Sequence, residues 1–308
     1  MLLSKNIECE KNVFNLHNNL QMKKNLFLAV MLLCASLVSC SKDEDENGET
    51  NGNKPENQEV TKTLPKNHAY VDFNLPSGTL WAKTNVGANK PQDFGYYFAW
   101  GETTPYGQNA KGYSSSWKGE TSDGYLKSKP KKKFDWSTYM WANNKEELLL
   151  KYNNNTKFST PKCKADKILS LNNEDDAANV LWKEGWQTPT LSQVKELLDK
   201  SICVWTSNYC KTGVSGILIL KKNKENEVYK TSPNSFKGKE DHLFFPAAGD
   251  LDYEEVSNPK KCGFYWIKEL DAKEPRKAYT LDFNDTEKIT TNTRARCFGR
   301  SIRPVFKK

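Results

Sequence analysis

Short runs of β-branched and aromatic residues recur along residues 67–308 and alternate with Gly, Pro and Asn. Such runs are typical of strands, because these side chains pack well on a half-buried sheet and the intervening residues favour turns. The pattern predicts opening strands at 70–73, 79–86 and 96–100. It predicts later strands at 202–205, 216–220, 228–231, 242–245, 264–267, 279–283 and 301–306.

Two segments between these groups of strands have the periodicity of amphipathic helices. Residues 177–182 follow an acidic turn, which suits the positive end of a helix dipole. Residues 191–198 place their apolar side chains on one face, and Thr190 and Gln193 have the spacing of a capping box. A shorter helix is predicted at 146–152. The order of strands, helices and strands predicts an α+β fold rather than a parallel βαβ sheet.

The first 66 residues follow a different pattern. Lys23 and Lys24 precede an apolar run that ends in Leu-Val-Ser-Cys at Cys40. The run has roughly 14 residues, fewer than the roughly 20 that span a bilayer, so it is typical of a signal peptide. Its ending resembles a bacterial lipobox, which implies cleavage before Cys40 and lipidation of that thiol. Met22 is then the expected start, and residues 1–39 are the expected signal peptide.

An acidic run at 41–46 comes directly after Cys40 and resembles the surface-export signal of lipoproteins in Bacteroidetes-type bacteria. Residues 47–66 contain almost no apolar side chains, so they cannot bury enough surface to order themselves. We therefore expect a disordered tether at 40–66 and one folded domain at 67–308. The expected location is the outer membrane, with a lipid anchor and the domain facing the cell exterior.

The formal net charge of +8 favours anionic partners. The predicted export of the protein to the cell surface argues against nucleic acid as the physiological partner. The expected partners are therefore the membrane, through the lipid, and a glycan or another surface protein.

The number and spacing of the cysteines do not indicate a particular chemistry. Removal of the signal and lipidation of Cys40 leave an odd number of thiols, so at least one stays free or pairs between chains. An extracytoplasmic address permits a disulfide, whose partners the sequence does not specify. The remaining thiols are Cys163, Cys203, Cys210, Cys262 and Cys297.

Nine short motifs occur in order along residues 70–305. They are YVD at 70–72, LPSGTLWA at 75–82, NVGA at 85–88, FAWGE at 98–102, DDAA at 175–178, Trp186 with PT at 189–190, FPAAG at 245–249, Gly263 with YW at 265–266, and GRSIRPV at 299–305. Together they resemble the Fibrobacter succinogenes major paralogous domain. The resemblance implies a C-type-lectin-like, formylglycine-generating-enzyme-like α+β fold with short mixed sheets, two principal helices and long loops.

The same resemblance implies that the two ends of the domain meet. The strand at 301–306 should then pair with the opening strands. Because Pro304 has no N–H to donate, this segment should lie at an edge of its sheet or end a ladder.

Catalytic signatures are missing from the sequence. There is no HExxH, P-loop or GxGxxG motif, and His242 is the only realistic base for a Ser-His or Cys-His site. Formylglycine-generating relatives use a cysteine pair near the C-terminal end, whereas Cys297 stands alone there. We therefore expect no enzyme activity and no cofactor. Asp250 and Asp252, with Glu254 and Glu255, are a calcium candidate against the alternative of a solvated acidic loop.

A long polar insertion at 103–159 carries aromatic and basic residues beyond what a core needs. Loops on a rigid scaffold are frequent binding sites, although a solvated loop is the alternative. We expect ring stacking by Trp117, Trp136 and Tyr139, and steering of an anionic ligand by Lys131, Lys132 and Lys133. The predicted function is a non-enzymatic surface binding module for glycan or protein. The alternatives are a structural or fimbria-associated subunit and, less directly, an enzyme with a dispersed site.

Overall fold

A computed structural model describes residues 64–105, 133–143, 147–225, 227–238 and 241–308, all within one unit, Val60–Lys308. The expected signal peptide, Cys40 and the tether up to residue 63 lie outside the described residues. So do Trp117, Lys131 and Lys132 of the predicted ligand face.

The described strands form four small sheets, and every ladder in them is antiparallel. The first sheet has the order β1 (Tyr70–Val71), β2 (Thr79–Ala82), β11 (Val305–Lys307). The second has the order β3 (Ser201–Thr206), β4 (Gly216–Lys221), β5 (His242–Pro246). The third has the order β10 (Ile289–Ala295), β9 (Lys277–Asn284), β8 (Cys262–Leu270). The fourth is the hairpin of β6 (Asp250–Asp252) and β7 (Glu255–Ser257).

Both principal helices form where the sequence predicts them. α2 (Ala177–Trp182) begins at Asp176, whose carboxylate accepts from the N–H groups of Ala178 and Asn179 at 3.0 and 3.4 Å. α3 (Leu191–Lys200) begins at Thr190 with the complete capping box, which satisfies two otherwise unpaired N–H groups. Short 3₁₀ turns also occur at η1 (Thr156–Phe158), η2 (Asn173–Asp175), η3 (Tyr209–Lys211) and η4 (Pro233–Ser235). The α+β class is thus confirmed, but the expected mixed sheets are wrong, because the parallel pairs are isolated bridges such as Tyr265 with Ser301.

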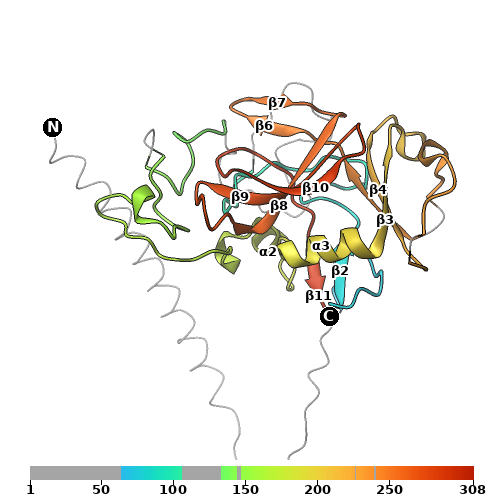
Figure 1. Ribbon diagram of the computed structural model, residues 1–308, viewed down its shortest axis with the longest axis horizontal. Helices are drawn as coiled ribbons and strands as arrows, with labels where there is room; N and C mark the ends of the chain where they lie inside the picture. The colour runs from blue at the N-terminus through green and yellow to red at the C-terminus, as the bar shows by residue number, and fades with distance from the viewer. Residues whose placement is uncertain (1–63, 106–132, 144–146, 226, 239–240) are drawn as a thin grey trace, which may run out of the picture. The chain divides into compact units, whose positions relative to one another are not determined.

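The sheets and α3 share the core. Figure 1 shows β6 and β7 above the β8–β9–β10 sheet and α3 below it, with β3 and β4 at one end. One apolar cluster contains Trp100, Trp186 and Trp266, and a second packs α3 against β4, β5, β8 and β9 through side chains such as Leu197. Burial of these large side chains stabilises the fold by about 1.5–3 kcal/mol each.

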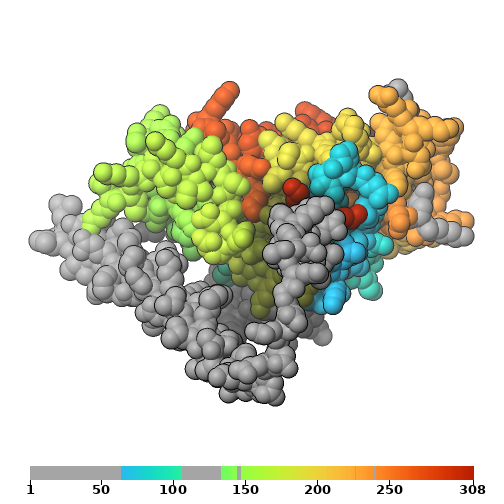
Figure 2. All heavy atoms as spheres, turned by 90° about the horizontal axis from the view of Figure 1, so that it is seen from below, coloured from blue at the N-terminus to red at the C-terminus, as the bar shows by residue number. Residues whose placement is uncertain are grey.

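The predicted closure of the domain is confirmed. β11 pairs with β2, opposite β1, and lies at the edge of that sheet, as expected for a segment that follows Pro304. The ladder covers only Val305–Lys307, which is shorter than predicted. Figure 2 shows the first described residues, in blue, beside yellow α3, with a few dark-red C-terminal residues next to them. The Ser77 N–H accordingly donates to Glu196 on α3 at 2.9 Å.

Several predicted elements do not form as expected. Residues 96–100 are buried, yet they pair through a single bridge from Phe98 to Arg300 rather than a ladder. No strand forms over 228–231, where Val228 is 68% exposed. The described residues 147–152 are not helical, and Leu149 instead bridges Ala142 and Ser159.

Candidate functional site

The structure brings the end of the polar insertion against the acidic β6–β7 turn. The Phe134 N–H donates to the Tyr253 carbonyl at 2.8 Å, and the Tyr253 N–H donates to the Phe134 carbonyl at 2.9 Å. Phe134 is fully buried in the core, so this pair of hydrogen bonds fixes the turn to the body of the domain. We call the surface around this bridge the Lys133–Tyr253 patch; it comprises Lys133, Asp135, Trp136, Asp252, Tyr253 and Glu254.

Tyr253 presents an aromatic ring to solvent. The residue is 52% exposed and lies between β6 and β7 with a positive φ of 57°. Non-glycine residues rarely adopt this conformation, and here it belongs to the tight turn that joins β6 to β7. The Lys133 ammonium lies 4.9 Å from the ring centroid, within range of a cation–π contact. An exposed ring in a fixed backbone setting is suited to stacking on a flat ligand surface.

Lys133 is held in place by its neighbour Asp135. Their charged groups are 3.0 Å apart, and the hydrogen bond to Asp135 raises the pKa of Lys133. The Asp135 carboxylate also accepts from the Ser137 hydroxyl at 2.6 Å and the Thr138 N–H at 3.0 Å. The lysine therefore stays charged throughout the physiological range beside the exposed ring of Tyr253.

The other two described residues of the predicted ligand face behave differently. Trp136 is half-buried and packs edge-to-face on Tyr139, with ring centroids 5.7 Å apart. Tyr139 is only 2% exposed; its hydroxyl donates to the Trp100 carbonyl at 2.6 Å and accepts from Arg296 Nε at 2.9 Å. Such a ring cannot stack on a sugar, so the prediction for Tyr139 is corrected to a core role.

The calcium candidate is also corrected. Asp250 lies 3.4 Å from the guanidinium of Arg300, a cation that is 1% exposed, and burial raises the pKa of Asp250. An arginine thus stands where the sequence suggested a metal beside Asp250 and Asp252. Within the described ranges, no group of three or more His, Cys, Asp or Glu side chains could hold a metal ion.

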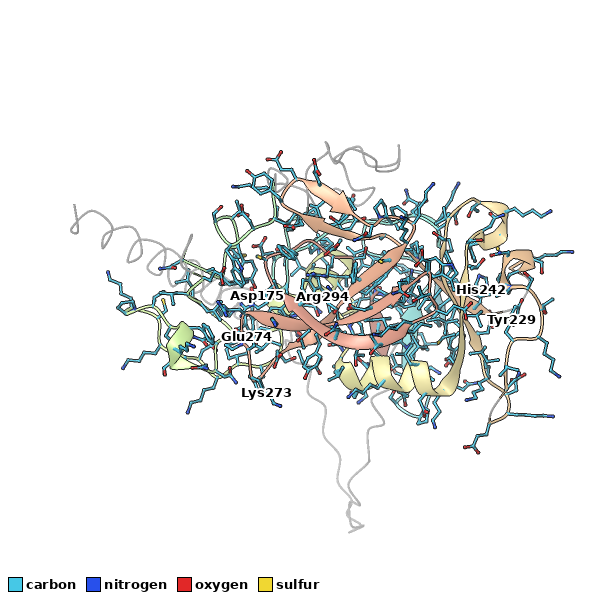
Figure 3. The ribbon with its side chains drawn as sticks, turned by 45° about the horizontal axis from the view of Figure 1, so that its top comes forward. Asp175, Tyr229, His242, Lys273, Glu274 and Arg294 are labelled. Carbon is cyan, nitrogen blue, oxygen red and sulfur yellow. The ribbon has the colours of Figure 1, made fainter. Side chains whose placement is uncertain are left out.

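A second pair of charges lies on the face of the β8–β9–β10 sheet near Asp250. Arg294, labelled in Figure 3, pairs with Asp282 at 2.8 Å, and its guanidinium lies 4.6 Å from the centroid of the Phe264 ring. Arg300 Nε and Asp282 Oδ1 are buried without a hydrogen-bond partner in the part of the chain that the structure describes. Buried polar atoms are usually paired, so these two retain unused bonding capacity.

Sequence reasoning missed this pair of charges because β10 was not predicted. The strand reads ITTNTRA and is only half-buried, so it lacks the apolar alternation of the other strands. Thr290, Asn292 and Arg294 alternate along β10 and share one face of the strand. This alternation is the sequence signal from which the strand could have been predicted.

Among the described residues, Cys163, Cys203, Cys210 and Cys262 carry free thiols. His242 opens β5 as predicted, and its Nε2 lies 2.7 Å from the Tyr209 hydroxyl. The histidine therefore has a titratable neighbour that the sequence did not indicate.

Comparison of the chain with protein-family models, with curated proteins and with solved structures found no match. Among the helices that the structure describes, none is long and apolar enough to cross a membrane.

Proposed function

We propose that the chain is a non-enzymatic surface lipoprotein whose domain at 67–308 binds a glycan at the Lys133–Tyr253 patch. The observation that carries the proposal is the exposed Tyr253 ring, anchored through Phe134 and accompanied by the Lys133 ammonium. The proposed fold of this domain is the C-type-lectin-like α+β fold implied by the nine motifs, which resemble the Fibrobacter succinogenes major paralogous domain. The meeting of β1, β2 and β11 is consistent with that class.

The chemistry of the patch favours a glycan over a flat protein surface. A tyrosine ring stacks on the apolar face of a sugar, and its hydroxyl reaches a sugar hydroxyl. Lys133 supplies N–H donors for an oxygen of that sugar. The net positive charge of the chain attracts anionic glycans at long range. Exposed charges are screened by salt over a Debye length of about 8 Å at physiological strength, so binding should weaken as salt is added.

The test is a screen of the full chain against immobilised neutral and anionic glycans, followed by titration of each glycan that binds. Aromatic contacts contribute about 0.5–1.5 kcal/mol, so Tyr253→Ala should weaken binding about 3- to 10-fold. Lys133→Ser should weaken binding and flatten its salt dependence. The matched control is Val228→Ala, which alters another exposed apolar side chain outside the patch.

Two results would count against this function. Retention of full affinity by Tyr253→Ala would move the site elsewhere on the chain. Failure to bind any glycan, together with stable self-association, would favour a structural subunit instead.

The proposed address rests on the sequence around Cys40. Labelled palmitate should enter the full chain expressed in a bacterium with a lipoprotein pathway, and Cys40→Ala should lose the label. Neutralising the acidic run at 41–46 should reduce the access of external protease to the domain. Equal labelling of the two chains would contradict lipidation at Cys40, and unchanged access would remove the export role of the run.

A further inference from the structure

A groove lies between the start of α3 and the adjoining ends of β8 and β9, outside the Lys133–Tyr253 patch. Figure 1 shows α3 below the sheet that contains these two strands. The groove has a volume of about 440 Å³, within the range of about 300–1,000 Å³ that is common for small-molecule sites. We call it the α3–β8 groove, and its walls include Leu169, Leu191, Lys195, Glu269, Leu270 and Tyr279.

Hydrogen bonds join the segments that form this groove. The N–H of Leu191, the first residue of α3, donates to Glu269 Oε2 at 2.9 Å. The N–H of Leu270, at the end of β8, donates to the Leu169 carbonyl at 2.9 Å. The walls are therefore fixed in the absence of a ligand, and such preorganisation lowers the ordering cost of binding.

Three leucines from different segments give the groove an apolar surface. Leu270 is buried and Leu191 is half-buried, whereas Leu169 is 41% exposed. The half-buried ring of Tyr279, on β9, lines the same groove. An apolar group that entered the groove would remove this surface from water, which is favourable.

Lys195 and Glu269 bring opposite charges to the groove. Lys195 is exposed and lies one helical turn from Leu191, on the same side of α3. Glu269 is half-buried; burial raises the pKa of its carboxyl group, and the hydrogen bond from Leu191 opposes that shift. Among the residues that the structure describes, Lys195 and Glu269 form no ion pair with each other. Both charges are therefore available to a ligand.

We propose that the α3–β8 groove binds a short apolar peptide whose two termini are free. The ammonium group of the peptide donates to the Glu269 carboxylate, and the carboxylate of the peptide accepts from the Lys195 ammonium. The apolar side chains of the peptide cover the leucines of the groove. This site is separate from the proposed glycan site, so each can be tested without the other.

The two charges of the groove favour a zwitterion over a ligand with a single charge. An apolar anion would be repelled by Glu269, and an apolar cation would be repelled by Lys195. A single amino acid carries both charges on one carbon atom, which suits two protein groups that are close enough to pair. Lys195 and Glu269 do not pair, so the charges of the ligand must be further apart. An extended dipeptide spans roughly 7 Å and separates them.

The test titrates leucyl-leucine into the full chain by isothermal titration calorimetry. The dipeptide should bind with a Kd of about 1 mM or lower, which is a modest affinity for a ligand of this size. N-acetyl-leucyl-leucine lacks the ammonium group, and leucyl-leucine amide lacks the carboxylate. Both should bind more weakly than the unmodified dipeptide. Absence of saturable binding of leucyl-leucine, or equal binding of the three compounds, would overturn the proposal without any variant.

Two substitutions assign the charges to their residues. Lys195→Met should weaken leucyl-leucine binding about fivefold, the effect of one exposed ion pair, and should leave the amide unaffected. Glu269→Gln keeps an oxygen for the Leu191 N–H but removes the charge, so it should weaken the dipeptide about tenfold and leave the acetylated compound unaffected. Equal losses for all three compounds in either variant would contradict the assignment.

Two control variants separate this groove from the rest of the surface. Lys230→Met removes an exposed lysine outside the groove and should leave leucyl-leucine binding unchanged. Tyr253→Ala alters the proposed glycan site and should also leave it unchanged. A loss of dipeptide binding in Tyr253→Ala that matched the loss in Glu269→Gln would place the peptide at the Lys133–Tyr253 patch and overturn the inference.

Discussion

At the scale of single residues, buried arginines distinguish this domain from an ordinary apolar core. Arg303 is fully buried, and its guanidinium donates to the Asn85 side chain at 2.8 Å and the Phe244 carbonyl at 2.8 Å. It also donates to the carbonyls of Ala82 and Lys83. These acceptors are uncharged, so the guanidinium acts as a bracket between the opening strands and β5. Burial lowers its pKa to about 10, which leaves it charged at neutral pH.

Arg303→Lys should destabilise the domain strongly, although the charge is retained. One ammonium cannot reach acceptors that are spread around a planar guanidinium, so buried carbonyls would lose their donors. Each unsatisfied buried group costs about 1–3 kcal/mol, which predicts a loss of about 3 kcal/mol or more in urea unfolding.

The matched control is Arg276→Lys. Arg276 is one-third exposed and pairs with Glu147 and Glu274 at 2.7 and 2.8 Å. Surface ion pairs contribute about 0–1 kcal/mol, so this exchange should shift the unfolding midpoint little. Equal shifts of the unfolding midpoint for the two exchanges would show that the buried Arg303 guanidinium adds nothing to the stability of the domain.

At the scale of elements, the sequence predicted those helices and strands that are stabilised by interactions between residues close together in the chain. The capping box at Thr190 and the acidic turn before α2 depend on residues within one helical turn, and both helices begin where expected. The strands at β4 and β5 are buried runs of apolar residues and were equally clear. The polar hairpin β6–β7 was missed, because its pairing is supported by Gly299 from a distant part of the chain.

The candidate site was predictable only in part for the same reason. Lys133 and Trp136 were named from the composition of the insertion, but nothing in the sequence indicated that Tyr253 would join them. Tyr139 resembled a solvent-facing aromatic, because it lies in a long and mostly polar insertion. Its hydrogen-bond partner Arg296 is 157 positions away, and only the tertiary fold makes it a core residue.

At the scale of the whole domain, the C-terminal segment connects elements from distant parts of the sequence. Gly299 bridges to Leu251, Arg300 to Phe98, and Ser301 to Tyr265. Val305 then pairs with both Gln187 and Trp81, and the ladder of β11 on β2 follows. Ile302, Val305 and Phe306 are all buried. The segment therefore forms long-range contacts with the opening strands, the helical region and the second half of the chain.

Truncation after Gly299 should abolish cooperative unfolding of the domain. It removes three buried apolar side chains, each of which contributes about 2–5 kcal/mol in a packed core, together with the Arg303 bracket. Domains of this kind have a total stability of about 5–15 kcal/mol, so the loss approaches or exceeds what is available. Thermal unfolding followed by near-ultraviolet circular dichroism should show a sloping baseline in place of a transition.

Removal of Lys308 alone is the control, because it deletes an exposed residue and leaves the paired residues of β11 intact. A chain ending at Gly299 that kept the parent's melting curve would show that the closing segment is dispensable. The cooperativity of unfolding would then have to come from the β3–β4–β5 and β8–β9–β10 sheets.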